Sequence, residues 1–260
     1  MDLSTYLDDL ASRGRYCFTT DQAVGALNTS PVAARAAIRR ARARARLATP
    51  SRGFHVIVPP EYRALGSLPG EQFVPQLMEH LGLTYYAGLL TAAQLHGAAH
   101  QAPMSFQVVL ARNRPTILAG GVRVAFVARG NVGQIPITSK NTPRGELRVS
   151  TPEATAFDLV GYVQHAAGLS NVATLLGELA EQMDAGALLA ETAHSPLPWA
   201  QRLGFLLEHV GAGNLAVPLG DHVAHHARDF VLLSPGATSK EGPRDSRWKV
   251  VVNDAVEADA

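Results

Sequence analysis

The sequence predicts an α+β protein, in which an N-terminal winged helix-turn-helix precedes a larger mixed α+β domain. The first observation is the order of patterns between residues 1 and 62, where three helical patterns are followed by a short hairpin pattern. The second is the distribution of charge: from Gln22 to Pro60 there is no Asp or Glu, and seven arginines give this window +7. The whole chain carries only +1. We therefore predict two domains, residues 1–62 and 63–260, separated near Pro59-Pro60.

The three N-terminal helices follow from apolar spacing and from residues that cap helices. Leucines three or four apart begin at Leu3 and predict a first helix that stops near Gly14. Thr20 is the expected N-cap of a second, short helix. Ser30 is the expected N-cap of the third helix, and Pro31 suits its first position because no hydrogen bond is lost there. Between the first two helices we expect an apolar turn that buries the single cysteine, Cys17, as a structural thiol.

A two-stranded hairpin is predicted after the third helix. The segment "LATPSRGFHVIVPP" contains β-favouring residues on both sides of a turn at residues 50–53. Such a hairpin is the expected wing of the N-terminal domain. In the second domain the patterns predict helices over residues 71–81, 83–96, 152–165, 171–184 and 198–210, and strands over residues 106–111, 122–128, 147–150, 230–233 and 248–252.

The third helix divides into faces when residues are set about 100° apart. The expected core stripe holds Ala34, Ile38, Ala41 and Ala45. Arginines flank this stripe on both sides: Arg35, Arg39, Arg42 and Arg46 on one, and Arg40 and Arg44 on the other. Small side chains lie opposite the core, so the helix fits a DNA major groove, with cations placed to reach the phosphates. The predicted DNA-binding residues are Ser30, Val32, Arg35, Arg39, Arg40, Arg42 and, on the wing, Arg52; Arg44 and Arg46 approach the helix end and are weaker candidates.

Two other interpretations of the arginine helix remain open. It could be a solvated helix of an arginine-rich protein, but such a helix commonly carries acids that pair with its arginines, and this one has none. It could also be a basic surface for RNA or for an acidic protein. The preceding helix-turn-helix order favours DNA.

Composition and motifs disfavour an enzyme or a membrane protein. One cysteine allows no internal disulfide, and no signal peptide or membrane span is visible, so we expect a cytoplasmic protein. His222, with His225 or His226, has spacing compatible with zinc, and a catalytic site would also need a third ligand and an open position. Asp221 and Asp229 are nearby, but no HExxH motif exists. We predict no catalytic residue, no metal and no cofactor. A metal-dependent enzyme that uses these histidines is the less favoured alternative.

Several strings, in a fixed order over nearly the whole chain, carry a resemblance to a known family. They are "SRGFHVIVPPEYR", "YYAGLLTAAQLHGAAHQAP", "QVVLARNRPTILAGGVRVAFV", "VSTPEATAFDLV", "WAQRLGFLLEHVG" and "RWKVVVN". In these the sequence resembles the AbiEi family, the antitoxins of the abortive-infection AbiE type IV toxin–antitoxin systems. Relatives commonly have a glycine between the recognition helix and the wing. This chain has "ARARARLA" instead, so we expect a longer helix here.

The resemblance implies a winged-helix domain that binds repeats in the promoter of its own operon and represses it. It also implies a C-terminal domain that counteracts a nucleotidyltransferase-like toxin, without a stable complex between the two proteins, in defence against phage. No heptad seam predicts a dimer, so we expect a monomer that binds double-stranded DNA cooperatively. The alternative is a winged-helix regulator whose C-terminal domain senses a ligand.

Overall fold

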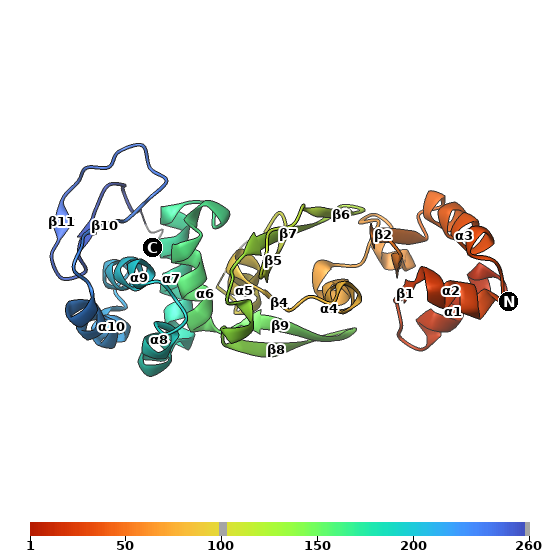
Figure 1. The fold of residues 1–260 in the computed structure, drawn as a ribbon, viewed down its shortest axis with the longest axis horizontal. Helices are drawn as coiled ribbons and strands as arrows, with labels where there is room; N and C mark the ends of the chain where they lie inside the picture. The colour runs from red at the N-terminus through yellow and green to blue at the C-terminus, as the bar shows by residue number, and fades with distance from the viewer. Residues whose placement is uncertain (99–102, 258–260) are drawn as a thin grey trace. The chain divides into compact units, whose positions relative to one another are not determined.

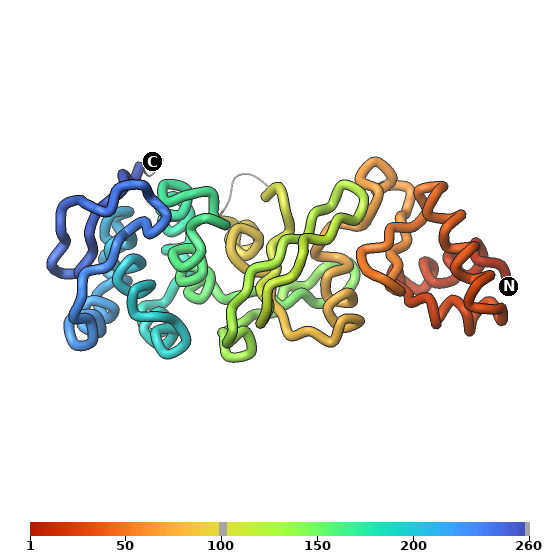
Figure 2. The backbone as a smooth tube through the Cα atoms, turned by 45° about the horizontal axis from the view of Figure 1, so that its top comes forward, coloured from red at the N-terminus to blue at the C-terminus, as the bar shows by residue number. Residues whose placement is uncertain are grey.

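The computed structural model describes residues 1–98 and 103–257 as a mixed α+β protein with three sheets (Figure 1). The chain divides into two compact units. Unit 1 contains Met1–Tyr86, Met104–Val132 and Ser139–Arg148, and unit 2 contains Ala87–Pro103, Gly133–Thr138 and Val149–Ala260. The backbone therefore leaves unit 1 after Tyr86 and re-enters it at Met104, a path that can be followed in Figure 2.

Unit 1 begins with three helices, α1 (Leu3–Ser12), α2 (Thr20–Leu27) and α3 (Pro31–Ala43), as the sequence predicts. Figure 1 shows them grouped beside strands β1 and β2. Their apolar sides enclose one core, which α3 joins through Ile38. The buried members of that core are Tyr6, Leu7, Leu10, Phe18, Ala23, Ile38, Leu47 and Ile57. All eight lie within residues 1–62, so this part of the chain has an apolar core of its own.

The N-cap of α3 is the predicted residue, whereas the N-cap of α2 is not. Ser30 caps α3, because its hydroxyl accepts a hydrogen bond from the Ala33 amide at 3.2 Å. The cap of α2 is Thr19 and not Thr20. Thr19 and Gln22 form a reciprocal capping box, in which each side chain bonds the backbone amide of the other. Thr20 instead hydrogen-bonds His55 with its hydroxyl.

The expectation of a longer third helix is wrong, since α3 ends at Ala43. Ala45 adopts a left-handed backbone conformation with φ 53°. The Ala45 amide donates to the Arg42 carbonyl and the Arg46 amide to the Ala41 carbonyl, both at 3.0 Å. These two bonds form a Schellman motif, which commonly ends helices with glycine at this position. Here an alanine takes the place of the glycine, and it is exposed rather than part of the core.

The predicted hairpin is the larger part of a three-stranded antiparallel sheet. Strands β1 (Cys17–Thr19), β2 (Leu47–Ser51) and β3 (Phe54–Ile57) lie in the order β1-β3-β2. Cys17 therefore sits in a strand and not in the expected turn. The residue is half-buried, and burial raises the pKa of its thiol to about 12. Arg52 and Gly53 connect β2 to β3, with Gly53 at φ 80°.

The rest of unit 1 is built on α4 (Gly70–Leu81) and on the larger sheet, after a short 3₁₀ turn at Pro60–Tyr62. That sheet has six strands in the order β6-β7-β5-β4-β9-β8. Their bounds are β4 (Tyr85–Ala87), β5 (Phe106–Leu110), β6 (Ile117–Ala119), β7 (Val122–Ala128), β8 (Ile137–Thr142) and β9 (Gly145–Ser150). A single helix over residues 83–96 is a wrong prediction, because strand β4 precedes the shorter helix α5 (Leu89–Leu95).

Unit 2 is mainly helical. Besides α5 it contains α6 (Pro152–Gly161), α7 (Leu169–Leu179), α8 (Ala185–Glu191), α9 (Leu197–His209) and α10 (Gly213–His226), together with a small sheet of β10 (Val231–Leu232), β11 (Arg244–Asp245) and β12 (Val250–Val251). Helices α6, α7 and α9 confirm the predictions over 152–165, 171–184 and 198–210, with short 3₁₀ turns completing the first two. No helix within the described ranges, 1–98 and 103–257, has the length and apolar character needed to cross a membrane.

Candidate nucleic-acid interface

Helix α3 presents most of its arginines to solvent, on the faces that the sequence assigns to them. Ala34 and Ile38 are 0% and 5% exposed and fix the side of the helix that faces the core. Val32, in the first turn, is 71% exposed, which is unusual for a large apolar side chain. Arg35, Arg39, Arg40, Arg42 and Arg44 are all exposed. The helix therefore combines an exposed apolar tip with a row of exposed cations.

The exposed arginines of α3 have no acidic partner. Across residues 1–98 and 103–257, neither these five nor Arg52 forms an ion pair. Arg46 differs, because its guanidinium donates to Ser4 Oγ at 2.8 Å and to Asp8 Oδ1 at 3.1 Å on α1. Arg46 therefore connects α1 to the end of α3. The other arginines keep their donors available for an anionic partner.

A buried histidine lies behind this helix. His55 on β3 is 5% exposed, and its ring nitrogens hydrogen-bond the hydroxyls of Thr20 at 2.9 Å and Thr49 at 3.1 Å. Burial, together with the smaller effect of the positive charges of Arg42 and His80, lowers the pKa of His55 to about 4. A neutral His55 therefore joins β3 to β2 and to the start of α2, without adding charge beneath the basic surface.

Arg52 lies at the tip of the β2–β3 hairpin with an exposed side chain. Its backbone carbonyl accepts a hydrogen bond from His80 Nε2 on α4 at 3.3 Å. The adjacent Gly53 provides the positive φ that a two-residue connection needs. The backbone of this turn is thus held in place, while the guanidinium remains free to meet an anion.

Formal charge follows the two units closely. Unit 1 has 17 Lys and Arg residues against 8 Asp and Glu, a net +9, whereas unit 2 has 6 against 14, a net −8. The sequence reasoning missed one contribution to this division. Between Met104 and Arg148 there are seven basic residues and a single acid, Glu146. In this segment Arg112, Arg123 and Arg148 are exposed, and a charge count over the segment would have revealed them.

The histidines considered as metal ligands lie at the end of α10. His222 and His226 stack with ring centroids 4.3 Å apart. The Nδ1 atoms of His225 and His226 contact the carbonyls of Asp221 and His222, at 2.7 and 2.8 Å. No group of three potential metal-ligating side chains occurs within the described part of the chain. His100, the partner of His96 in a second histidine pair of the sequence, lies outside the described residues.

The fold as a whole is similar to that of a solved protein. The crystal structure of the RV2827C protein from Mycobacterium tuberculosis superposes with a TM-score of 0.68. The alignment covers 95% of this chain and 90% of that chain, at 18% sequence identity. At this identity the likeness concerns the fold alone. The sequence matches none of the curated proteins.

A family model identifies the central part of the chain. Residues 86–209 match the model described as the AbiEi antitoxin C-terminal domain. The match supports an antitoxin role for this chain, and an antitoxin of this family implies a toxin partner. This match supports an AbiEi family antitoxin, as the resemblance of the sequence strings predicts. AbiEi antitoxins are not a known enzyme family.

Proposed function

We propose that this AbiEi antitoxin binds DNA sequence-specifically and represses its own toxin–antitoxin operon. Through its C-terminal domain it counteracts a nucleotidyltransferase-like toxin without forming a stable complex, as in type IV systems that defend against phage. It acts as a monomer that binds operator repeats cooperatively. These steps extend the antitoxin role into a mechanism, and each has its own test.

The observation that carries DNA binding is the exposed face of α3. Arginines that are exposed, unpaired and free of neighbouring acids have no structural role to explain their concentration on one helix. A major groove accepts one α-helix, and arginine pairs bidentately with guanine O6 and N7. Arg39 and Arg40 lie nearest to the line opposite the core, so we assign base contact to one of them. Arg35 and Arg42 then reach phosphates.

The surrounding elements support a winged helix-turn-helix. Helix α2 ends at Leu27, and the left-handed backbone of its C-cap Asn28 (φ 46°) allows the short turn before α3. The hairpin of β2 and β3 follows α3 and carries Arg52 at its tip. We infer that α3 is the recognition helix and this hairpin the wing, with Arg52 on a neighbouring phosphate or in the minor groove. The net charge of +9 on unit 1 would attract DNA from a distance.

Binding of operator and scrambled duplexes, measured across a salt series, tests this assignment. Arg39→Ala or Arg40→Ala should cost about 1–3 kcal/mol on the operator and reduce the preference over scrambled DNA, because a base contact is lost. Arg52→Ala should weaken both duplexes alike and reduce the salt slope by about one, as loss of a phosphate contact does. Arg13→Ala is the matched control, since Arg13 is also exposed but is paired with Asp9 on α1.

The outcome that counts against groove recognition is equally specific. If Arg39→Ala and Arg40→Ala, singly and together, bind the operator as the native chain does, α3 does not lie in the groove. If Arg13→Ala weakens binding as much as Arg39→Ala, only the general positive charge of the domain matters.

Antitoxin activity needs a separate test in cells that express the toxin from the neighbouring gene. The chain with His222→Ala, His225→Ala and His226→Ala should still restore growth, because the proposed mechanism involves no metal centre. Loss of rescue by a triple variant with native thermal stability would revive the alternative of a metal-dependent activity.

A further inference from the structure

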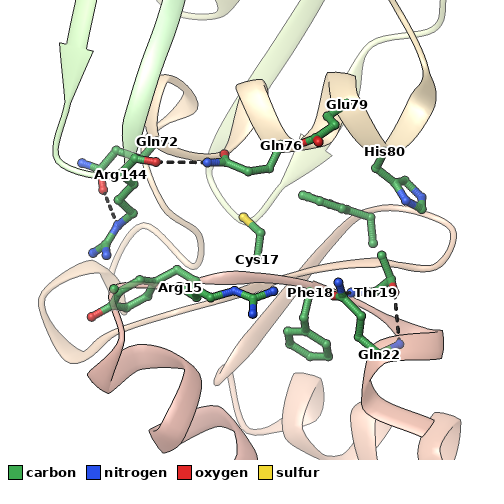
Figure 3. A pocket seen from close by; sticks show the side chains of 13 residues that line it. Arg15, Cys17, Phe18, Thr19, Gln22, Gln72, Gln76, Glu79, His80 and Arg144 are labelled. Carbon is green, nitrogen blue, oxygen red and sulfur yellow. Dashed lines mark hydrogen bonds between the residues drawn. The ribbon is translucent and has the colours of Figure 1, made fainter. Parts of the chain in front are cut away.

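A cleft of about 470 Å³ opens within unit 1 on the side of β1 that faces α4 (Figure 3). One wall comes from Arg15, Cys17 and the residues that follow them, and the other from Gln72, Gln76 and neighbours on α4. Arg144, from the turn between β8 and β9, borders the cleft as well. A cavity of this size matches those that hold small metabolites in other proteins.

Arg144 is held in a fixed position at this cleft. Its Nε donates to Gln72 Oε1 at 2.8 Å, and its guanidinium carbon lies 3.3 Å from the centroid of the Tyr16 ring. These contacts orient the plane of the guanidinium and leave its two terminal NH₂ groups without a partner among the described residues. A pre-oriented guanidinium with free terminal donors is suited to bind a carboxylate or a phosphate.

A second cation lies on the other wall. Arg15 lines the cleft, its side chain is exposed, and it forms no ion pair with any residue that the structure describes. The acid that lines the cleft, Glu79, lies on the exposed part of α4 next to His80. The two arginines therefore make the cleft attractive to an anion.

Gln76 adds an unmet hydrogen-bond acceptor. Its Nε2 donates to the Arg144 carbonyl at 3.0 Å, while its Oε1 is buried and has no hydrogen-bond partner. A buried polar atom without a partner is costly and uncommon, and in a cleft it indicates where a ligand donor can bind. A hydroxyl group at this point would satisfy Oε1. The ring of Phe54, almost fully buried and packed against His80, forms an apolar part of the same cavity.

We propose that this cleft binds a small metabolite that carries an anionic group and a hydroxyl group. The anion, a carboxylate or a phosphate, binds the terminal donors of Arg144 with Arg15 nearby, and the hydroxyl donates to Gln76 Oε1. This assignment goes beyond DNA binding and antitoxin activity and depends on neither. A hydroxy acid and a sugar phosphate both supply this chemistry.

Calorimetric titration of the full chain with L-malate and, separately, D-ribose 5-phosphate distinguishes these sources. We expect one of the two compounds to bind saturably. Smaller molecules that carry only its anionic group or only its hydroxyl groups should bind more weakly. These are inorganic phosphate and D-ribose for the sugar phosphate, and acetate and glycerol for the hydroxy acid. Arg144→Gln should lower the affinity at least about 10-fold, because a charge-assisted pair is lost. Gln76→Leu should lower it by several-fold, with native thermal stability as the check on folding.

Arg123→Gln is the matched control, because Arg123 on β7 is exposed, lies in the same unit and does not line the cleft. It should bind as the native chain does. The proposal is overturned if neither compound binds saturably up to about 10 mM, or if Arg123→Gln loses as much affinity as Arg144→Gln. Should Arg144→Gln not fold, Gln76→Leu decides: native affinity in that variant also rejects the site. No DNA is present, so the result is independent of the proposed repressor function.

Discussion

Ala45 adopts an unfavourable backbone conformation that the fold requires. Its left-handed conformation ends α3 and directs the chain into β2, yet it places Cβ close to the following carbonyl oxygen. For an L-residue this conformation costs roughly 1–2 kcal/mol. The Schellman hydrogen bonds and the packing of Ile38 and Leu47 on either side must therefore outweigh that cost.

Ala45→Gly should stabilise the protein by about 0.5–1 kcal/mol, because glycine adopts this conformation freely but loses more backbone entropy on folding. Ala43→Gly, two residues earlier, is the matched control. It is the last residue of α3 and has a helical backbone, where glycine should destabilise by up to about 1 kcal/mol. Urea unfolding of both variants measures the difference. Equal effects of the two substitutions would show that the conformation of Ala45 carries no special cost.

His55 predicts a dependence of stability on pH. Its folded pKa of about 4 is below the ordinary 6.5, so the unfolded chain binds the proton more tightly. The stabilisation of the folded state by neutral His55 is fully present above pH 6.5 and is lost as the pH falls towards 4. Between pH 7 and pH 5 the loss should be about 2 kcal/mol.

His55→Gln tests this dependence by urea unfolding at the two pH values. The variant should be less stable at pH 7, because the hydrogen bonds to Thr20 and Thr49 are altered. Its free energy of unfolding should, however, fall less between pH 7 and pH 5, because most of the loss due to His55 is absent. A variant with the full native pH dependence would assign the effect to other groups.

At the scale of the elements, α9 and the C-terminal strands depend on one close approach. A Cβ at Gly204 would overlap the ring of Trp248, which is fully buried next to β12. The Trp248 Nε1 atom donates to Glu208 Oε2, one turn further along α9, at 2.8 Å. The glycine thus provides the space that lets the indole lie on the helix.

Gly204→Ala should therefore destabilise the protein by about 2 kcal/mol or more, since the indole must move out of its position. Gly177→Ala on α7 is the control, because a Cβ there meets only Val210, at an ordinary 3.8 Å. That change should be neutral or stabilising, as expected for alanine in a helix. Thermal unfolding followed by tryptophan fluorescence measures both. A Gly204→Ala variant as stable as the native chain would contradict the packing described here.

The elements also show what the sequence could predict. Helices α1, α2, α3, α4 and α9 have capping residues or clear periodicity, and they lie within a few residues of their predicted positions. Strand β8 alternates too weakly to be recognised, with no fully buried residue. Strand β4 was assigned to a helix because three consecutive buried residues have no period of two. Helix α8, of seven residues, is too short for a periodic signal.

The candidate interface was easier to predict than the cleft. Local spacing places Arg35, Arg39 and Arg42 on one helical face, and the structure leaves them exposed. The cleft depends on Gln76 and Arg144, which are 68 positions apart in the sequence. A short sequence window gives no information about such a pair. The whole assignment of Arg144 therefore required the tertiary structure.

At the scale of the molecule, the core of the N-terminal helices predicts that residues 1–62 fold alone. All of the buried residues of that core lie within this fragment. The fragment should show helical circular dichroism and bind operator DNA, but more weakly than the full chain, because the cations between Met104 and Arg148 are missing. A fragment without helical signal, or a fragment 63–260 that binds the operator as well as the full chain, would contradict this prediction.

The interleaving of the two units along the chain has a consequence during synthesis. The first residue of unit 2 to be synthesised is Ala87, whereas the last residue of unit 1 is Arg148. Translation proceeds at about 5–20 residues per second, so a ribosome passes through this interval in seconds. Throughout that time the N-terminal core can be complete, but the six-stranded sheet is unfinished, because its strand β9 ends only at Ser150. The nascent antitoxin therefore holds its basic helix outside the ribosome well before the AbiEi domain is finished.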